Sequence, residues 1–176
     1  MNIVLAILLV LLGIIALLLV MAVFMRNKHY INRQVTVNAP LPKVFDFLRL
    51  LKNQDKFNKY AKADPSRKEE FKGTDGTVGF IYSWSGNKNV GEGAKEIISI
   101  TEGKRIETEI RFIKPMKVSA SIIFETEALS ENQTRVSFIN TGILKYPFNV
   151  MIPVFEKNFA KDMDESLATL KNILEK

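Results

Sequence analysis

The chain of 176 residues lacks cysteine altogether and has only one histidine and one tryptophan. Without cysteine it forms no disulfide bond, no thiolate metal site and no cysteine nucleophile, which excludes disulfide-stabilised scaffolds and cysteine-dependent enzymes. The single histidine, His29, follows a long apolar segment so closely that we expect it at a membrane surface, where neither a Ser-His-Asp triad nor a histidine metal site is expected. The sequence therefore predicts no metal site, no cofactor and no catalytic residues.

Charge is also absent from residues 1–25, of which 23 are apolar. As a helix rising about 1.5 Å per residue, residues 3–25 would be about 34 Å long, enough to cross a hydrocarbon core of about 30 Å. A cleaved signal peptide has a basic start, a shorter apolar run and small residues before the cut, and this segment has none of the three. The sequence predicts a single-pass transmembrane anchor over residues 1–25, with cleavage and a buried helix as the alternatives.

Basic residues follow this segment directly. Arg26, Lys28 and Arg33 come after it and nothing basic precedes it, and positive flanks stay on the cytoplasmic side. We therefore expect the N-terminus outside, the C-terminal domain in the cytoplasm, and residues 26–33 as a basic juxtamembrane linker. Residues 26–72 hold 12 Lys or Arg against 5 Asp or Glu. Two interpretations of this excess stay open: a basic face that contacts anionic lipid, and a basic face that is only solvated. Without a recognition motif, we expect no nucleic-acid partner.

The domain over residues 34–176 shows helix and strand signals in turn. Residues 34–38 alternate as in a half-buried strand, residues 41–51 have an apolar helical face, and a second short helix carries Phe57 and Tyr60. After a turn at residues 64–66 the period becomes two. The strands expected there are residues 78–84, 90–100, 105–112, 118–126 and 134–141, which form an antiparallel meander.

Two features of these strands bear on the interior. Gly91 and Gly93 indicate a bulge or a close approach of another backbone. Glu107 and Glu109 share one strand face, as a general acid and base would, but arginines stand on the same face on either side of them. A solvated ladder of opposite charges is therefore the favoured interpretation.

The helical period returns near the C-terminus. A helix of about 22 residues from near Pro153 has a polar face that includes Asp162 and Asp164. Its apolar stripe consists of Met151, Phe155, Phe159, Met163, Leu167, Leu170 and Leu174. These elements predict an α+β domain in which a curved antiparallel sheet wraps around the long C-terminal helix, with space for a cavity between them.

Seven short segments, taken in order, make the chain similar to a known superfamily over nearly all of residues 31–176. They are residues 38–40 (Asn-Ala-Pro), 44–48 (VFDFL), 82–88 (YSWSGNK), 91–93 (GEG), 103–106 (GKRI), 134–136 (TRV) and 146–149 (YPFN). The chain resembles the helix-grip (START-like, SRPBCC) superfamily, which includes START lipid-transfer domains, the major birch pollen allergen type and the polyketide cyclase/dehydrase group. Members often have tryptophans after the first helix, where this chain has Phe57 and Tyr60.

The resemblance implies a helix-grip fold with a cavity for a hydrophobic ligand. We expect a membrane-anchored binding module that holds a lipid or another hydrophobic small molecule between the sheet and the C-terminal helix. A polyketide cyclase/dehydrase-like enzyme on an apolar substrate and a non-catalytic regulatory domain with a collapsed cavity are the alternatives, because this fold serves carriers, sensors and enzymes alike.

Candidate ligand-binding residues are aromatic, apolar or uncharged polar side chains that face the expected interior, with plain core packing as the alternative role. They are Phe80, Tyr82, Trp84, Ile110, Phe112, Ile122, Phe138, Asn140, Tyr146, Met151 and Phe155. Four of them, Tyr82, Trp84, Asn140 and Tyr146, also bring a hydrogen-bonding group that would orient a ligand.

Overall fold

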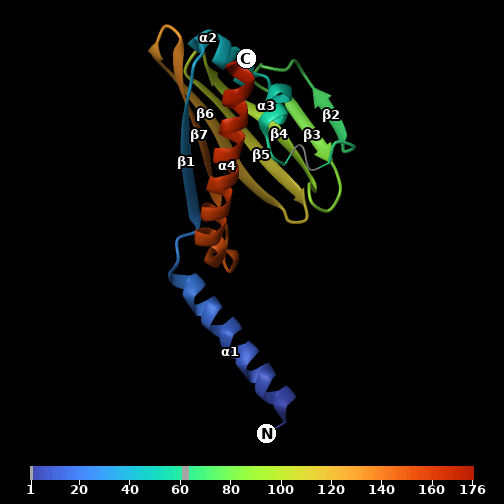
Figure 1. Ribbon diagram of the computed structural model, residues 1–176. Helices are drawn as coiled ribbons and strands as arrows, with labels where there is room; N and C mark the ends of the chain where they lie inside the picture. Colours follow the sequence, from blue (N-terminus) through green and yellow to red (C-terminus); the bar gives the residue numbers. More distant parts are fainter. Residues whose placement is uncertain (1, 61–63) are drawn as a thin grey trace.

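The computed structural model describes residues 2–60 and 64–176. A separate apolar helix precedes a domain of seven strands and several helices (Figure 1). In chain order the elements are α1 (Ile3–Phe24), β1 (Lys28–Val37), α2 (Leu41–Arg49), α3 (Leu51–Phe57), β2 (Lys68–Lys72), β3 (Ile81–Ser85), β4 (Glu92–Thr101), β5 (Arg105–Lys114), β6 (Val118–Ser130), β7 (Gln133–Ile143), the 3-10 helix η2 (Phe148–Met151) and α4 (Ile152–Leu174).

All seven strands form one antiparallel sheet in the order β1-β7-β6-β5-β4-β3-β2. The sheet curves around α4, which runs along its inner face, while α2 and α3 close the end of the domain away from α1 (Figure 1). The predicted meander and long C-terminal helix are confirmed. The predicted charged ladder is present on the outer face, where Arg105 pairs with Glu107 and Glu125, and Arg111 pairs with Glu96 and Glu109.

The sheet differs from the sequence-based expectation at three places. β1 begins at Lys28, because residues 28–33 pair with residues 138–143 of β7, so most of the predicted linker over residues 26–33 is strand. β2 was not predicted because all five of its residues are exposed, and no alternation of polarity marks it. β3 starts at Ile81 because the residues before it form a turn, in which Gly79 has a positive φ.

The hydrophobic core fills the end of the domain under α2 and α3. Leu48 and Leu51 of this helical cap and Leu170 of α4 are completely buried, and Ile97 and Ile106 of the sheet are closed off in the same way. Each fully buried leucine or isoleucine contributes about 1.5–3 kcal/mol relative to an exposed one. Solid packing at this end leaves the end next to α1 as the place where the sheet and α4 can enclose a space.

Helix α1 leaves the domain at the end opposite α2 and α3 (Figure 1). It is 22 residues long with a mean hydropathy of 3.6, and none of its most apolar window is buried against the domain, so it could cross a membrane by length and composition. Its C-terminal end is held by η2, since the side-chain amide of Asn149 donates hydrogen bonds to the carbonyl oxygens of Ala22, at 2.7 Å, and Met25, at 3.0 Å.

The basic residues of positions 26–72 do not gather at one end of the domain, and their contact with lipid stays a prediction. Those of α2 and α3 lie at the end of the domain away from α1 (Figure 1). Several of the others are ion-paired, as Arg33 is with Asp164, and Arg67 is buried. Lys62 lies outside the described residues.

Candidate functional site: a cavity between the sheet and the C-terminal helix

A cavity of about 530 Å³ lies between the inner face of the sheet and α4. Strands β1 and β3 to β7 form its floor, and α3, α4 and η2 supply the remaining walls. This volume is within the range of about 300–1,000 Å³ that small-molecule sites have. The alternative of a collapsed cavity is therefore wrong for this structure.

Nine of the eleven candidate residues line this cavity, and their role in binding a ligand stays a prediction. They are Tyr82, Trp84, Ile110, Phe112, Ile122, Phe138, Asn140, Met151 and Phe155. Two candidates do not line it. Phe80 precedes β3 and packs in the core against Phe71, with ring centroids 6.3 Å apart. Tyr146 is exposed beside the C-terminal end of α1.

The aromatic wall depends on two glycines of the β3–β4 region. The Trp84 ring lies over Gly93 on the adjacent strand, where an added Cβ would come within 2.6 Å of the indole. Trp84 in turn meets Phe112 edge to face at 5.7 Å. Gly91 has a positive φ, and a Cβ there would lie 2.3 Å from the carbonyl oxygen of Lys114. The predicted close approach of another backbone at these glycines is confirmed.

The opposite wall is the apolar stripe of α4. Phe155 and Phe159 stack with their centroids 5.3 Å apart, and Met163 follows one turn later. The stripe predicted Phe159 and Met163 as inward-facing, although the candidate set did not include them. Phe57 and Tyr60, singled out by the sequence after the first helix, both line the cavity from α3 and the segment after it.

His29 is buried in β1 and lines the cavity, which corrects the prediction that it lies at a membrane surface. It is paired across the sheet with Gly142, and only a residue without Cβ leaves room for the imidazole, because a Cβ there would come within 2.7 Å of it. The ring Nε2 donates to Asn140 Oδ1 at 2.8 Å. Burial lowers the pKa of His29, and the bond to Asn140 opposes this.

A buried charged cluster, which the sequence analysis missed, stands at the inner end of the cavity. Arg67 Nη2 binds Asp55 Oδ2 at 2.7 Å and the Tyr82 hydroxyl at 2.5 Å. The Tyr82 hydroxyl donates to Glu69 at 3.0 Å, and burial raises its pKa. Lys95 lies 3.7 Å from the other oxygen of Asp55 and is 4% exposed. Alternation along β4 places Lys95 on the same face as inward-facing Gly93 and Ile97, and this pattern could have predicted that Lys95 is buried.

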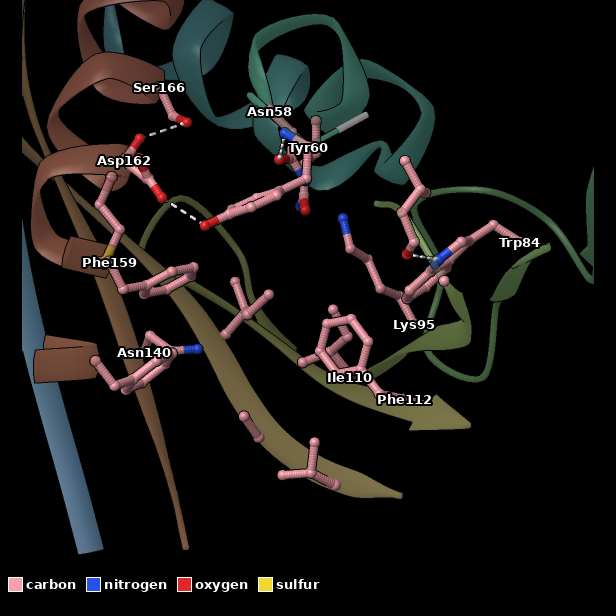
Figure 2. A pocket seen from close by; sticks show the side chains of 18 of the residues that line it. Asn58, Tyr60, Trp84, Lys95, Ile110, Phe112, Asn140, Phe159, Asp162 and Ser166 are labelled. Carbon is pink, nitrogen blue, oxygen red and sulfur yellow. Dashed lines mark hydrogen bonds between the residues drawn. The ribbon is translucent and has the colours of Figure 1, made fainter. Parts of the chain in front are cut away.

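Asp162 also lines the cavity, although its spacing placed it on the polar face of α4. It accepts a hydrogen bond from the Tyr60 hydroxyl (Figure 2) and another from Lys59 at 2.8 Å. Burial raises the pKa of Asp162, but the bonds from Lys59 and Tyr60 outweigh this and hold it below the usual range. Asp164, by contrast, is on the polar face as predicted and pairs with Arg33.

The cavity opens at the end of the domain next to α1. The exposed residues that line it there come from the β3–β4 connection, from the β5–β6 turn and from η2, and we call them the mouth. The mouth consists of Lys88, Asn89, Lys114, Pro115, Met116, Phe148 and Met151.

The polar candidate residues do not meet at one point. Tyr82 directs its hydroxyl to Arg67 and Glu69, Asn140 is held by His29, and Tyr146 lies outside the cavity. Among the residues that the structure describes, no three potential metal ligands gather. The arrangement is suited to enclosing an apolar molecule and to meeting a few polar atoms of it.

No family model matches the sequence, and no curated protein does. Solved structures match across the domain. Norcoclaurine synthase from Thalictrum flavum, in complex with dopamine and hydroxybenzaldehyde, has a TM-score of 0.61 at 12% identity, covering 84% of this chain and 87% of its own. Aha1 from Colwellia psychrerythraea has a TM-score of 0.58 at 18% identity, covering 84% of this chain and 96% of its own. Ara h 8.0201 has a TM-score of 0.53 at 16% identity, covering 81% of this chain and 98% of its own.

The chain has the helix-grip fold. At these identities the likeness shows the fold alone, and it confirms the fold expected from the seven sequence segments. In this fold the sheet curves around α4. The cavity lies between them, in the part of the interface that the core does not fill.

Proposed function

We propose that this protein is a membrane-tethered binding module that holds a hydrophobic small molecule in the cavity of its helix-grip domain and exchanges it with the bilayer. Helix α1 serves as the transmembrane anchor. The domain then lies on the cytoplasmic side, because Arg26 and Lys28 directly follow the helix. The apolar lining, and not any catalytic arrangement, gives the cavity its function.

One observation carries this proposal: the anchor and the mouth share the same short helix. In η2, Phe148 and Met151 line the cavity, and Asn149 between them binds the end of α1 through Ala22 and Met25. The point at which α1 would enter the membrane is therefore next to the opening of the cavity. A ligand dissolved in the bilayer reaches the cavity here without crossing water.

The surface around the mouth suits contact with lipid headgroups. Met116, Phe148 and Met151 are each about half exposed, although they are large and apolar. Lys88 and Lys117 are exposed in the same connections, and Lys145 is exposed in the segment between β7 and η2. Apolar side chains ringed by lysines favour an anionic leaflet, where each lysine near the surface contributes about 1 kcal/mol.

Native mass spectrometry of the full chain, released from nanodiscs made with the lipids of its own expression membrane, tests whether it holds a ligand. We expect one apolar molecule of discrete mass bound per chain. A chain that carries no adduct, and that gains none when membrane lipid extract is added, would overturn the proposed function.

The position of the mouth is tested separately with an environment-sensitive fluorophore on single cysteines, which the cysteine-free chain allows. Labels at Met116→Cys and Phe148→Cys should shift to shorter emission wavelengths in nanodiscs. The matched label at Glu131→Cys, in the turn between β6 and β7 at the far end, should report water. Equal emission from all three sites would rule out a mouth that faces the bilayer.

A further inference from the structure

The buried lysine at the inner end of the cavity indicates the chemistry of the ligand. Lys95 projects from β4 into the cavity (Figure 2) and is 4% exposed. Its one charged partner in the described part of the chain is Asp55, at 3.7 Å, which is longer than a hydrogen bond. An ammonium group has three donors, and its contact with Asp55, just beyond hydrogen-bond distance, leaves these donors able to meet further acceptors.

The neighbouring groups do not supply those acceptors. Asp55 gives its other oxygen to Arg67 at 2.7 Å, and Glu69 is engaged by Arg67 and Tyr82. The cluster thus has two cations and two carboxylates, and its acceptors are used mainly by the guanidinium. Burial lowers the pKa of Lys95, as expected for an ammonium that is poorly compensated.

The sheet register places Lys95 at the depth where the hollow ends. Moving inward from the mouth, β4 first presents Gly93 opposite Phe112 and Trp84, then Lys95 opposite Ile110 and Tyr82. Ile97, the next inward residue, is completely buried in the core. A ligand that fills the cavity from the mouth therefore ends at the Lys95 ammonium.

We propose that the ligand is an amphipathic monocarboxylate such as a long-chain fatty acid, bound with its carboxylate at Lys95 and its hydrocarbon chain toward the mouth. The inference rests on the proposed function and specifies its ligand. A carboxylate supplies the missing acceptors in charge-assisted hydrogen bonds, and the aromatic and aliphatic walls bury the chain. A single negative charge suits this site better than a dianionic phosphate, because Asp55 and Glu69 are already present.

The test is a competition experiment on the full chain in nanodiscs. A fatty acid that carries a diazirine on its tail is photo-crosslinked to the protein, and the measured quantity is how far a competitor reduces the crosslinking. Unlabelled palmitic acid, methyl palmitate and hexadecanol are the competitors. We expect the acid to compete at least about tenfold better than the ester and the alcohol, because only the acid forms a charged hydrogen bond. In Lys95→Met this preference should disappear while competition by the ester is unchanged. Lys104→Met, exposed in the turn between β4 and β5 and outside the cavity, is the matched control and should keep the preference.

The wild-type comparison needs no variant, so the proposal remains testable even if Lys95→Met does not fold. Equal competition by the acid, the ester and the alcohol in the wild type overturns the carboxylate site and leaves a hydrophobic binding module in place. Failure of all three to reduce crosslinking, together with no adduct in native mass spectrometry, overturns the proposed function itself.

Discussion

The side-chain amide of Asn149 donates a 2.7 Å hydrogen bond to the carbonyl oxygen of Ala22, in the last turn of α1. The last carbonyl groups of a helix have no partner within it, so a buried amide from another element both satisfies one and fixes the direction of the helix. Asn149 is 3% exposed and Ala22 is 2% exposed. Helix α1 and the domain are thus joined by a specific contact as well as by a chain connection.

Replacing Asn149 by alanine should loosen the domain from α1 without unfolding it. The variant loses both hydrogen bonds to the end of α1, whereas the core under α2 and α3 is untouched. Distances between spin labels on Phe24→Cys and Lys157→Cys, measured by double electron–electron resonance in nanodiscs, should become broadly distributed. Asn132→Ala, in the exposed β6–β7 turn, is the control. An equally narrow distribution in both variants would show that the contact does not set the geometry.

A phenylalanine at Ala120 should occupy the cavity and displace the ligand. Ala120 lies on β6 and lines the cavity, so a larger side chain enters empty space and costs little stability. We expect the adduct in native mass spectrometry to be lost with little change in melting temperature. Ala128→Phe, exposed on the same strand outside the cavity, should retain the adduct. Full occupancy in Ala120→Phe would mean that the molecule binds elsewhere.

Gly93→Ala should destabilise the domain and move its only tryptophan. An added Cβ would lie 2.6 Å from the backbone oxygen of Arg111 and 2.6 Å from the Trp84 ring, so a strand or the indole has to shift. Strain of this kind costs about 1–3 kcal/mol of unfolding free energy. Urea unfolding followed by tryptophan emission measures both effects. The control, Ser85→Ala, changes an exposed residue of β3, and a Gly93→Ala variant as stable as this control would contradict the packing described.

The sequence predicted the parts of the molecule in which polarity and burial agree. Alternation of apolar and polar residues along residues 105–112 predicted the sheet. The apolar stripe of α4 predicted the long C-terminal helix, and the two patterns together predicted most of the cavity lining. It misplaced His29 because the residue closely follows the apolar segment, whereas pairing with Gly142 buries it in β1. It missed Lys95, which is buried on the inner face of β4 between Tyr82 and Ile110 of the neighbouring strands. It misplaced Phe80 because the alternation continues into a turn before the strand begins.

Acid should destabilise the domain through His29. Because burial lowers its pKa in the folded state below the ordinary value of 6.5, the unfolded chain takes up a proton at a pH where the folded chain does not. The stabilising contribution is therefore complete above pH 6.5 and is lost as the pH falls through the lower, folded-state pKa. Urea unfolding midpoints, measured from pH 7.5 to 5 with tryptophan emission, should fall in the wild type.

His29→Gln provides the comparison, because its amide keeps a donor for Asn140 and does not titrate. With no other histidine in the chain, the variant should show a flatter dependence over the same range. Parallel curves for the two proteins would mean that His29 is protonated equally easily in both states, which its buried position beside Phe155, with centroids 5.0 Å apart, argues against. A fall confined to the wild type would also make ligand release pH-dependent, since the imidazole lines the cavity and its charge would disfavour an apolar ligand.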